Sequence, residues 1–468
     1  MKIALVFPPY HHKEFSENLS VVDDEFGKYP PLNLAYVAAI LEKSGHEVIL
    51  IDSNALGLSK HETLKMVREF GPDFMGFMLT TYMFRETCSW IEYLKKNTGV
   101  PVFVGGINVW NYPEETIEKD YIDYAIIGPS SESLPRFIDA VEKGRPLDRI
   151  RGIAYMKGGK KIVNQPVSFD ENIDELPFPA RHLLPNSRYY SFISKRKNFT
   201  IMLLSKGCPY KCTFCAITNI PYYQRGIDSV MVEIKECYYR YGIREIDFFD
   251  ACFTVNREYV IKLCKFIMDS DMDFDWSCRT RVDLVDDELL HYMSRAGCKR
   301  IYYGIESASE NILSIMNKGI NLKKIKESIR LTKKHGIKAL GFFMLGNPGE
   351  TIESMNATIK LSKELDLDYV QFMHTIPKPM TVLDNEMKSG NHDYWREYVA
   401  GRADERRIET DWCDLPENLI DRYIRMAYIS FYLRPSYILK TMLEIKSFHE
   451  LKRYIKSAAK MMLWGRRF

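Results

Sequence analysis

The 468-residue sequence predicts an α/β protein with a Rossmann-like N-terminal domain, a partial (β/α)6 barrel of the TIM type and a helical C-terminal extension. Short apolar runs alternate with segments of helical period up to about residue 145, and a second such series begins near residue 199. The last residues are helical in period and basic. We expect these domains: 1–145; 146–195, a hairpin and linker; 196–390, the barrel; and 391–468, the C-terminal region.

In the first domain, continuous apolar runs predict strands at residues 2–7, 47–52, 74–79, 101–106 and 124–128. Between the first two runs, one helix places Leu34, Val37, Ala38 and Leu41 on one face and stops before Gly45. Strands and helices in this order indicate a parallel sheet covered on both faces. Ligands of such sheets bind beyond the carboxyl ends of the strands, which here carry Pro8, Pro9, Thr80, Thr81, Gly105, Gly106 and Gly128.

The second series predicts a barrel. Residues 154–165 predict a hairpin with Gly158 and Gly159 at its turn, and the proline-containing segment 175–185 predicts a linker. After the linker, strands are expected at 199–204, 245–250, 275–279, 300–306, 339–345 and 369–374, with helices at 256–269 and 321–335 among the intervening segments. Six such repeats without a change of order indicate a complete or partial barrel whose chemistry lies at the carboxyl ends of the strands.

The composition is that of a globular protein, with 46% apolar and 27% charged residues. A net charge of +3 gives no indication of a general phosphate-binding surface, so we expect no nucleic-acid partner. The N-terminal stretch fits a buried strand better than a signal peptide, and no apolar run reaches the roughly 20 residues of a spanning helix. We therefore expect a cytoplasmic protein whose ten cysteines are reduced thiols or metal ligands.

The charge is concentrated at the C-terminus. Residues 434–468 hold nine Lys or Arg and two Glu, which gives this tail a charge of +7 and the rest of the chain −4. At helical spacing, one face of the tail carries Phe448, Leu451, Tyr454, Ile455, Ala458 and Met462. Such a basic amphipathic end can bind an anionic membrane peripherally. The alternative is a helix that caps the barrel and leaves its basic face in water.

Three cysteines, Cys208, Cys212 and Cys215, follow the first predicted barrel strand in the loop SKGCPYKCTFC. Three thiolates at this spacing can hold three irons of a [4Fe–4S] cluster and leave the fourth iron open for a ligand. The alternatives are a zinc site completed from elsewhere in the chain and unrelated core cysteines. The other seven cysteines are scattered singly and are expected to be buried thiols, although Cys252 lies at the predicted barrel mouth.

This loop resembles the signature of the radical S-adenosylmethionine (SAM) superfamily. Further matches within residues 199 to about 380 are FFDACFTVN, YYGIES, MNKG with Lys318, and FMLGNPGET. The resemblance implies that the open iron chelates SAM and that an electron, from a donor such as flavodoxin or ferredoxin, cleaves SAM to a 5′-deoxyadenosyl radical. The residues expected to bind SAM are Phe214, Asp250, Arg279, Arg281, Glu306 and Gly346.

Each of these SAM assignments has a structural alternative. Asp250 and Glu306 can form salt bridges, Arg279 and Arg281 can form ion pairs at the barrel rim, and Gly346 can serve a turn. The family often has two consecutive acids where this chain has Asp250 and Ala251, so no role is assigned to a second acid.

Residues 28–52 and 104–115 resemble the N-terminal domain of the cobalamin-binding class of radical SAM enzymes. This implies a corrin and its nucleotide tail at the predicted sheet edge. The D-x-H-x-x-G loop that brings an axial histidine to cobalamin is absent, which leaves His11 or His12 as a substitute ligand. Ile107-Asn108 and the stretch GPSSES at 128–133 also depart from the family pattern, so a domain retained without cobalamin is the alternative.

The leading interpretation is a cobalamin-dependent radical SAM methyltransferase that acts on an unactivated carbon. The alternatives are cyclisation, carbon–carbon coupling or oxidation with the same cofactors, and a non-catalytic cobalamin or redox sensor. A methylthio-transferring enzyme is disfavoured, because that group has three further N-terminal cysteines and residues 1–87 contain none. The tail and the apolar residues Phe342, Phe343, Phe372 and Met373 suggest a lipid-like substrate, and other small molecules remain open.

Overall fold

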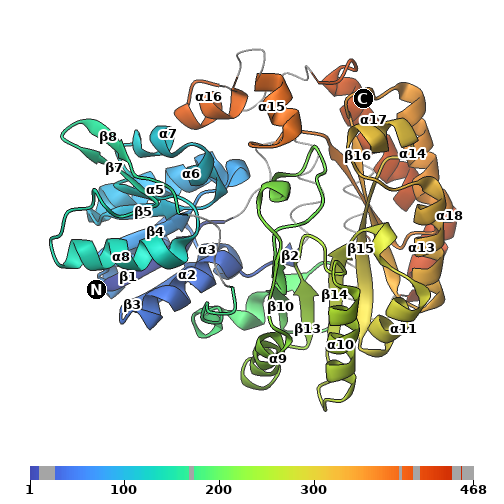
Figure 1. Cartoon of the computed structure of the whole chain (residues 1–468), viewed down its shortest axis with the longest axis horizontal. Coiled ribbons are helices and arrows are strands. Elements are labelled where there is room, and N and C mark those ends of the chain that lie inside the picture. The colour runs from blue at the N-terminus through green and yellow to red at the C-terminus, as the bar shows by residue number, and fades with distance from the viewer. Residues whose placement is uncertain (10–26, 168–172, 389–392, 404–411, 445–454, 456–468) are drawn as a thin grey trace.

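The computed structural model describes the chain except residues 10–26, 168–172, 389–392, 404–411, 445–454 and 456–468. Two α/β units lie side by side, as Figure 1 shows: the N-terminal unit in blue to teal and the barrel in green to orange. The segment that follows the last barrel strand returns across the top of the molecule and places α16 (Tyr394–Ala400) over the N-terminal unit. The fold is therefore the expected α/β arrangement of two domains with a helical C-terminal region.

The N-terminal unit is built on a seven-stranded sheet of order β3-β1-β4-β5-β6-β7-β8. The first five strands are parallel, and the last two are antiparallel. The strands are β1 (Lys2–Phe7), β3 (Glu47–Asp52), β4 (Phe74–Met78), β5 (Val102–Gly105), β6 (Tyr124–Ile126), β7 (Ile153–Lys157) and β8 (Lys160–Val163). The helices are α2 (Leu32–Lys43), α3 (Ser53–Leu56), α4 (Lys60–Phe70), α5 (Phe84–Thr98), α6 (Ile107–Asn111), α7 (Pro113–Ile117) and α8 (Ser130–Glu142).

The helix expected before Gly45 is α2. It ends at Lys43, and Gly45 follows with a positive φ of 85°. Leu34, Ala38 and Leu41 are buried as predicted. The predicted hairpin is formed by β7 and β8 with Gly158 and Gly159 between them. Because β7 pairs with β6, the hairpin extends the N-terminal sheet instead of standing in the linker where the sequence places it.

The second unit is a partial barrel of six parallel strands in sequential order. They are β10 (Phe199–Met202), β13 (Glu245–Phe248), β14 (Asp275–Thr280), β15 (Cys298–Glu306), β16 (Lys338–Leu345) and β17 (Tyr369–His374). The helices between and after them are α9 (Ile227–Lys235), α10 (Arg257–Met268), α11 (Asp287–Arg295), α12 (Glu310–Ile315), α13 (Leu322–Lys334), α14 (Ile352–Glu364), α15 (Val382–Lys388), α17 (Glu417–Tyr432) and α18 (Pro435–Glu444).

The two helices predicted within the barrel, 256–269 and 321–335, are α10 and α13. Their first predicted residues are the N-caps: the Asn256 side chain accepts from the Tyr259 backbone N–H, and Asn321 accepts from that of Lys324. Asparagine is favoured at this position because its side chain satisfies a backbone donor that the helix leaves free.

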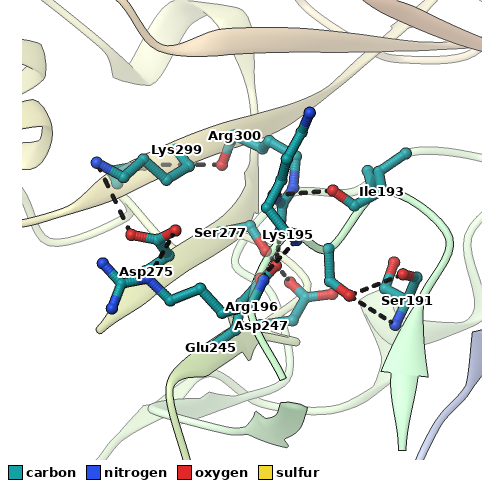
Figure 2. Close-up of polar contacts among 12 residues, drawn as sticks. Ser191, Ile193, Lys195, Arg196, Glu245, Asp247, Asp275, Ser277, Lys299 and Arg300 are labelled. Atoms are coloured by element: carbon teal, nitrogen blue, oxygen red, sulfur yellow. Dashed lines mark hydrogen bonds and ion pairs between the residues drawn. The ribbon is translucent and has the colours of Figure 1, made fainter. Parts of the chain in front are cut away.

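The amino end of the barrel is closed by the segment that precedes β10. Two short strands, β2 (Gly27–Lys28) and β9 (Tyr190–Ser191), pair there, and the following residues enter the barrel. The Glu245 carboxylate accepts the backbone N–H groups of Lys195 and Arg196, both at 3.0 Å, and also pairs with the Arg300 guanidinium (Figure 2). A ligand therefore has access to the barrel from the carboxyl ends of the strands.

The last strand, β17, has an open edge that α17 covers with tyrosine hydroxyls. The Tyr428 hydroxyl accepts the Phe372 N–H and donates to the Phe372 carbonyl, both at 3.1 Å. Tyr432 does the same for Val370, at 2.9 and 2.8 Å. An edge strand with unpaired backbone groups invites association with other chains, so these hydroxyls satisfy the edge in place of a further strand.

The amphipathic tail predicted from residue 446 onward lies outside the described residues, apart from Ile455. Of the described helices, none is both long and apolar enough to cross a membrane.

Candidate active site

The cysteine loop leaves the barrel after β10. It is framed by a two-stranded ladder, β11 (Ser205–Lys206) with β12 (Tyr223–Gln224), and contains the short helical turn η5 (Ala216–Asn219). Gly207 has a φ of 75°, and a Cβ there would lie 2.1 Å from the Pro221 carbonyl oxygen, so glycine is required where the loop closes. Thr213 holds the loop from two sides: its N–H donates to the Met316 carbonyl at 3.1 Å, and its carbonyl accepts from Leu383 at 3.2 Å.

All three cysteines of this loop are free thiols. Cys212 is buried, and Cys208 and Cys215 are partly exposed. Burial raises the pKa of the Cys208 and Cys212 thiols, while the positive charges of Lys318 and Arg281 act in the opposite direction. Among the described residues, no group of three His, Cys, Asp or Glu side chains is arranged as the ligands of a metal ion.

Two buried cations lie behind the loop. The Lys318 Nζ is 2.7 Å from the Glu306 Oε1, and both side chains are more than nine-tenths buried. Arg281 pairs with Asp283 through two contacts of 2.9 and 3.0 Å, and its Nη1 lies 4.0 Å from the Cys212 Sγ. The predicted alternative for Glu306, a salt bridge, is thus present beside the cysteine loop.

The backbone around Glu306 is unusual. Glu306 has a positive φ of 66° at the end of β15, a conformation that side-chain-bearing residues rarely adopt. A Cβ at Gly304 would lie 2.5 Å from the Glu306 carboxylate and 2.7 Å from the Lys318 amine. The sequence YYGIES therefore combines a glycine that makes room for the ion pair with a backbone held under strain, a combination that is common at functional sites.

Phe214 lies on the interior side of the cysteine loop. It packs against the buried cluster of Ile312, Met316 and Met344, as does Met373, and the Lys318 Nζ is 5.7 Å from the Phe214 ring centroid. Gly346, with a φ of 80°, is enclosed instead by the C-terminal region. A Cβ there would lie 2.8 Å from Ile420 and 2.9 Å from the His374 ring. The Gly346 carbonyl accepts a hydrogen bond from the Trp412 indole at 3.0 Å. The structure therefore shows a packing role for Gly346.

A cavity of about 650 Å³ lies between the two units. The N-terminal side contributes Gly105, Gly106 and Gly128, which the sequence predicts at the carboxyl edge of the sheet. The barrel side contributes two of the predicted SAM residues, Asp250 and Arg279. A Cβ at Gly105 would have no atom closer than 3.9 Å, so this glycine leaves open space in the cavity wall. The structure thus divides the predicted SAM residues between this cavity and the surroundings of the cysteines.

Asp250 and Arg279 are both engaged within the barrel. The Asp250 carboxylate accepts from the Leu204 N–H at 3.1 Å and the Ser205 hydroxyl at 2.5 Å, and burial raises its pKa to about 6. Arg279 forms a bidentate pair with Asp247 at 2.9 and 3.0 Å. Its guanidinium lies 3.8 Å from the ring centroid of Phe249. The floor of the cavity is thus held by hydrogen bonds and stacking before any ligand is bound.

The other predicted cobalamin residues, Pro8, Pro9, Thr80 and Thr81, lie at the same sheet edge but are not among the described residues that line the cavity. His11 and His12 lie outside the described residues. Sequence reasoning named Val37 on the apolar face of α2 but missed Asn33, Tyr36 and Ile40, which line the cavity beside it. Their spacing of three and four residues is a signal that could have shown a second face of this helix in contact with a ligand.

The remaining candidate residues take core positions. The seven scattered cysteines are all buried, as expected, and the Cys252 Sγ lies 3.6 Å from the Thr280 hydroxyl. Phe343 and Phe372 stack in the core beneath α17, with ring centroids 5.1 Å apart. They therefore take the core position that is the alternative to contact with a lipid-like substrate.

Comparisons with known proteins agree with this architecture. A family model described as the radical SAM superfamily matches residues 202–362, and a B12 binding domain model matches residues 21–138. The uncharacterized methyltransferase PH0819 of Pyrococcus horikoshii is 33% identical over 462 residues, which cover 96% of each chain. The chain belongs to the radical SAM superfamily.

Other similar proteins are named for other reactions. The anaerobic magnesium-protoporphyrin IX monomethyl ester cyclase of Rubrivivax gelatinosus is 26% identical over 83% of this chain and 70% of its own. The solved structure of OxsB, a cobalamin-dependent S-adenosylmethionine radical enzyme with aqua-cobalamin bound, has a TM-score of 0.67 at 16% identity. That match covers 99% of this chain and 72% of OxsB, and at this identity it shows a shared fold.

The radical SAM and B12-binding domains imply three cofactors: a [4Fe–4S] cluster, SAM and cobalamin. The residues present fit them, because the thiols are free, Gly105 leaves open space in the cavity wall and the carboxyl ends of both sheets meet at one cavity. The chain is thus an enzyme that requires a reductant and a small-molecule substrate.

Proposed function

We propose that this radical SAM enzyme transfers a methyl group to an unactivated carbon atom of its substrate. The observation that carries the proposal is the single cavity lined by both the B12-binding sheet and the barrel mouth. When bound, SAM and the cluster supply a radical that removes hydrogen from carbon, and cobalamin supplies the methyl group. The relationship to a methyltransferase along nearly the whole chain supports this reaction.

The protein's own residues bind and shield these groups. In this proposal Cys208, Cys212 and Cys215 hold the cluster, and Phe214, Arg281 and Glu306 surround the SAM that binds beside it. Asp250 and Arg279 lie nearer the cobalamin side and border the substrate. Gly346 allows the turn after β16 to pack closely against Ile420 and His374. The apolar side chains of the cavity wall, among them Val37, Phe103 and Trp110, exclude water from the reacting atoms.

The proposal can be tested before the substrate is known. The protein, reconstituted anaerobically with iron, sulfide and cobalamin, is incubated with SAM and dithionite or titanium citrate. A methyltransferase forms both 5′-deoxyadenosine and S-adenosylhomocysteine, because it uses SAM as radical source and as methyl donor. Formation of 5′-deoxyadenosine alone would favour cyclisation, coupling or oxidation, an alternative that the relationship to the magnesium-protoporphyrin cyclase supports. Formation of neither product would contradict an enzymatic role.

Replacement of each loop cysteine by Ala tests the cluster assignment. Cys208→Ala, Cys212→Ala and Cys215→Ala are each expected to lose the visible absorption of the cluster and more than nine-tenths of the 5′-deoxyadenosine. Cys252→Ala is the matched control, because Cys252 is a buried thiol at the barrel mouth that touches Thr280. Retention of a full cluster in any one of the three loop variants would contradict its assignment as a ligand.

We also propose that a flavodoxin or ferredoxin is the electron donor. Reduced flavodoxin or ferredoxin is expected to support 5′-deoxyadenosine formation in place of dithionite. If both carriers fail where dithionite succeeds, the donor belongs to another class.

We further propose that the C-terminal region contacts anionic membranes and that the substrate is lipid-like. On α18, Leu439, Met442 and Leu443 are exposed by 62%, 63% and 80%, and residues 434–468 carry a charge of +7. Apolar side chains beside a basic segment favour an anionic bilayer surface.

Sedimentation with phosphatidylglycerol vesicles tests membrane contact. The full chain is expected to sediment with these vesicles and not with phosphatidylcholine vesicles. The double variant Leu439→Ser, Leu443→Ser is expected to remain in the supernatant. Equal sedimentation of both proteins would show that α18 is not the contact, and a full chain that stays in solution with both kinds of vesicle would contradict membrane contact.

A further inference from the structure

Arg281 is held against the cysteine loop from several directions. Its Nε and Nη2 pair with the Asp283 carboxylate at 2.9 and 3.0 Å, and Nη2 also donates to the Lys318 carbonyl at 2.5 Å. The guanidinium lies 3.9 Å from the ring centroid of Tyr210. These contacts come from the loop itself, from the turn after β14 and from the segment after α12. Together they fix the guanidinium in one position.

The remaining nitrogen of this guanidinium is directed at a sulfur. The Arg281 Nη1 is 4.0 Å from the Cys212 Sγ, at the limit of a hydrogen bond to sulfur. The side chain of Arg281 is only 8% exposed, so water screens this contact little. Cys212 is also the buried member of the three loop cysteines. The other nearby cation, Lys318, points its amine to the Glu306 carboxylate at 2.7 Å.

We propose that Arg281 donates a hydrogen bond to the Cys212 thiolate when this thiolate binds the cluster, and thereby raises the cluster's reduction potential. The inference rests on the proposed function, because it requires a cluster at this loop. One electron from the reductant adds one negative charge to the cluster and its thiolates. An N–H donor and a positive charge at sulfur stabilise that reduced form more than the oxidised form.

This assignment gives Arg281 a role at the cluster in addition to its place beside SAM in the proposed function. Two of the three guanidinium nitrogens, Nε and Nη2, are already engaged by the Asp283 carboxylate and the Lys318 carbonyl. Arg281 is therefore a positioning residue that acts through Cys212. The neighbouring Asp283 has a defined part in the same arrangement: its carboxylate, 28% exposed, offsets the charge of the guanidinium.

A redox titration of the reconstituted full chain, followed by electron paramagnetic resonance, tests the proposal. In Arg281→Gln, the ratio of reduced to oxidised cluster at a fixed solution potential is expected to fall about tenfold, which corresponds to about 59 mV for a one-electron couple. Arg281→Lys keeps the charge and is expected to lie between this variant and the wild type.

Asp283→Asn is expected to shift the potential in the opposite direction. It removes a negative charge, while Tyr210 and the Lys318 carbonyl still hold the guanidinium in place. Shifts of the reduction potential with opposite signs in Arg281→Gln and Asp283→Asn distinguish this role from a structural one. A structural role would change the amount of cluster bound and leave the potential of the remaining clusters the same. Arg257→Gln is the matched control. Arg257 also forms an ion pair with an aspartate, Asp286, at 2.7 Å, but this pair is not part of the cysteine loop.

Equal potentials in the wild type and Arg281→Gln, at equal iron and sulfide content, would overturn the proposal. So would a shift of the same sign in Arg281→Gln and Asp283→Asn. Should Arg281→Gln fail to fold, Asp283→Asn and Arg281→Lys decide the question by the same measurement. A wild-type chain that binds no cluster would overturn the proposed function, whereas equal potentials overturn this inference alone.

Discussion

At the scale of residues, the site is built from charges that are paired before any ligand binds. Glu306 pairs with Lys318, Arg279 with Asp247 and Arg281 with Asp283. Asp250 differs because no cation pairs with it among the contacts of the described residues. Its carboxylate accepts hydrogen bonds from the Leu204 N–H and the Ser205 hydroxyl. Burial therefore dominates and raises the pKa of this carboxyl to about 6.

The raised pKa of Asp250 predicts a pH-dependent stability. A carboxyl whose pKa is higher in the folded chain binds its proton more tightly there, so its contribution to stability is lost as the pH rises through about 6. When the pH is raised from 5 to 7.5, we expect the wild type to lose about 1 kcal/mol more of its free energy of unfolding than Asp250→Asn, which has no proton to lose at this position. Urea unfolding at both pH values measures this difference. A difference that does not change with pH would contradict a buried, proton-binding Asp250.

The site residues named from the sequence are those that carry a chemical signature, and the residues defined by contact were missed. Three cysteines in one loop and an acid at a strand end are visible in the sequence because chemistry restricts the residue type. The partner of Arg279 is not visible, because Asp247 lies 32 positions away on the adjacent strand. Cross-strand contacts depend on register, and an apolar run does not determine register.

At the scale of elements, predicted strands and helices differ from the observed ones mainly at their ends. The strand expected at 199–204 stops at Met202, because the Leu204 N–H donates to the Asp250 carboxylate instead of to a neighbouring strand. The predicted helix 256–269 is one residue longer at each end than α10, because Asn256 and Asp269 cap the helix and are not part of it. Apolar periodicity locates the centre of an element, whereas the hydrogen bonds of individual side chains decide where it ends.

The glycine at the end of β5 predicts a selective loss of cobalamin. Because Gly105 does not have a positive φ and leaves open space in the cavity wall, a larger side chain there fills the cavity without straining the backbone. We expect Gly105→Leu to reduce bound cobalt at least tenfold and Gly105→Ala to reduce it only slightly. Iron content should remain that of the wild type in both. Undiminished cobalt in Gly105→Leu would show that cobalamin does not occupy this cavity.

The tyrosines of α17 predict a stability effect at the open barrel edge. Tyr428→Phe leaves the N–H and carbonyl of Phe372 without their partner, which should lower the free energy of unfolding by about 1–3 kcal/mol. Tyr423→Phe on the same helix is the control, because no hydrogen bond of the Tyr423 hydroxyl is found within the described part of the chain. Urea unfolding that cannot distinguish the two variants would contradict this role.

At the scale of the whole molecule, the proposed function depends on how the two domains face each other. The segment after β17 contacts the N-terminal domain. Within it, the Trp395 indole donates to the Pro377 carbonyl at 2.7 Å, and Arg396 pairs with Glu115 of the N-terminal domain at 2.5 Å. The sequence predicted both domains. It did not predict their relative placement, because α16 shows no chemical signature and its contacts join residues 281 positions apart.

The contact through α16 predicts that cobalamin binding depends on a residue outside the cavity. Arg396→Ala removes the ion pair with Glu115, so the N-terminal domain should be held less firmly against the barrel. We expect a weaker affinity for cobalamin, by about fivefold, with an unchanged iron content. Arg422→Ala, an exposed arginine on α17, serves as the control. Equal cobalamin affinity in both variants would show that this ion pair does not position the domain.

The central claim is that the cluster on the cysteine loop lies beside the cavity between the two domains, in which cobalamin binds and which this loop borders through Gly207 and Ile217. Electron paramagnetic resonance of the chain loaded with both groups, with the cluster reduced and the cobalt in its +2 state, tests it most directly. The account predicts that each signal is broadened and relaxes faster than in protein loaded with one group only. A spectrum equal to the sum of the two separate signals would contradict the claim.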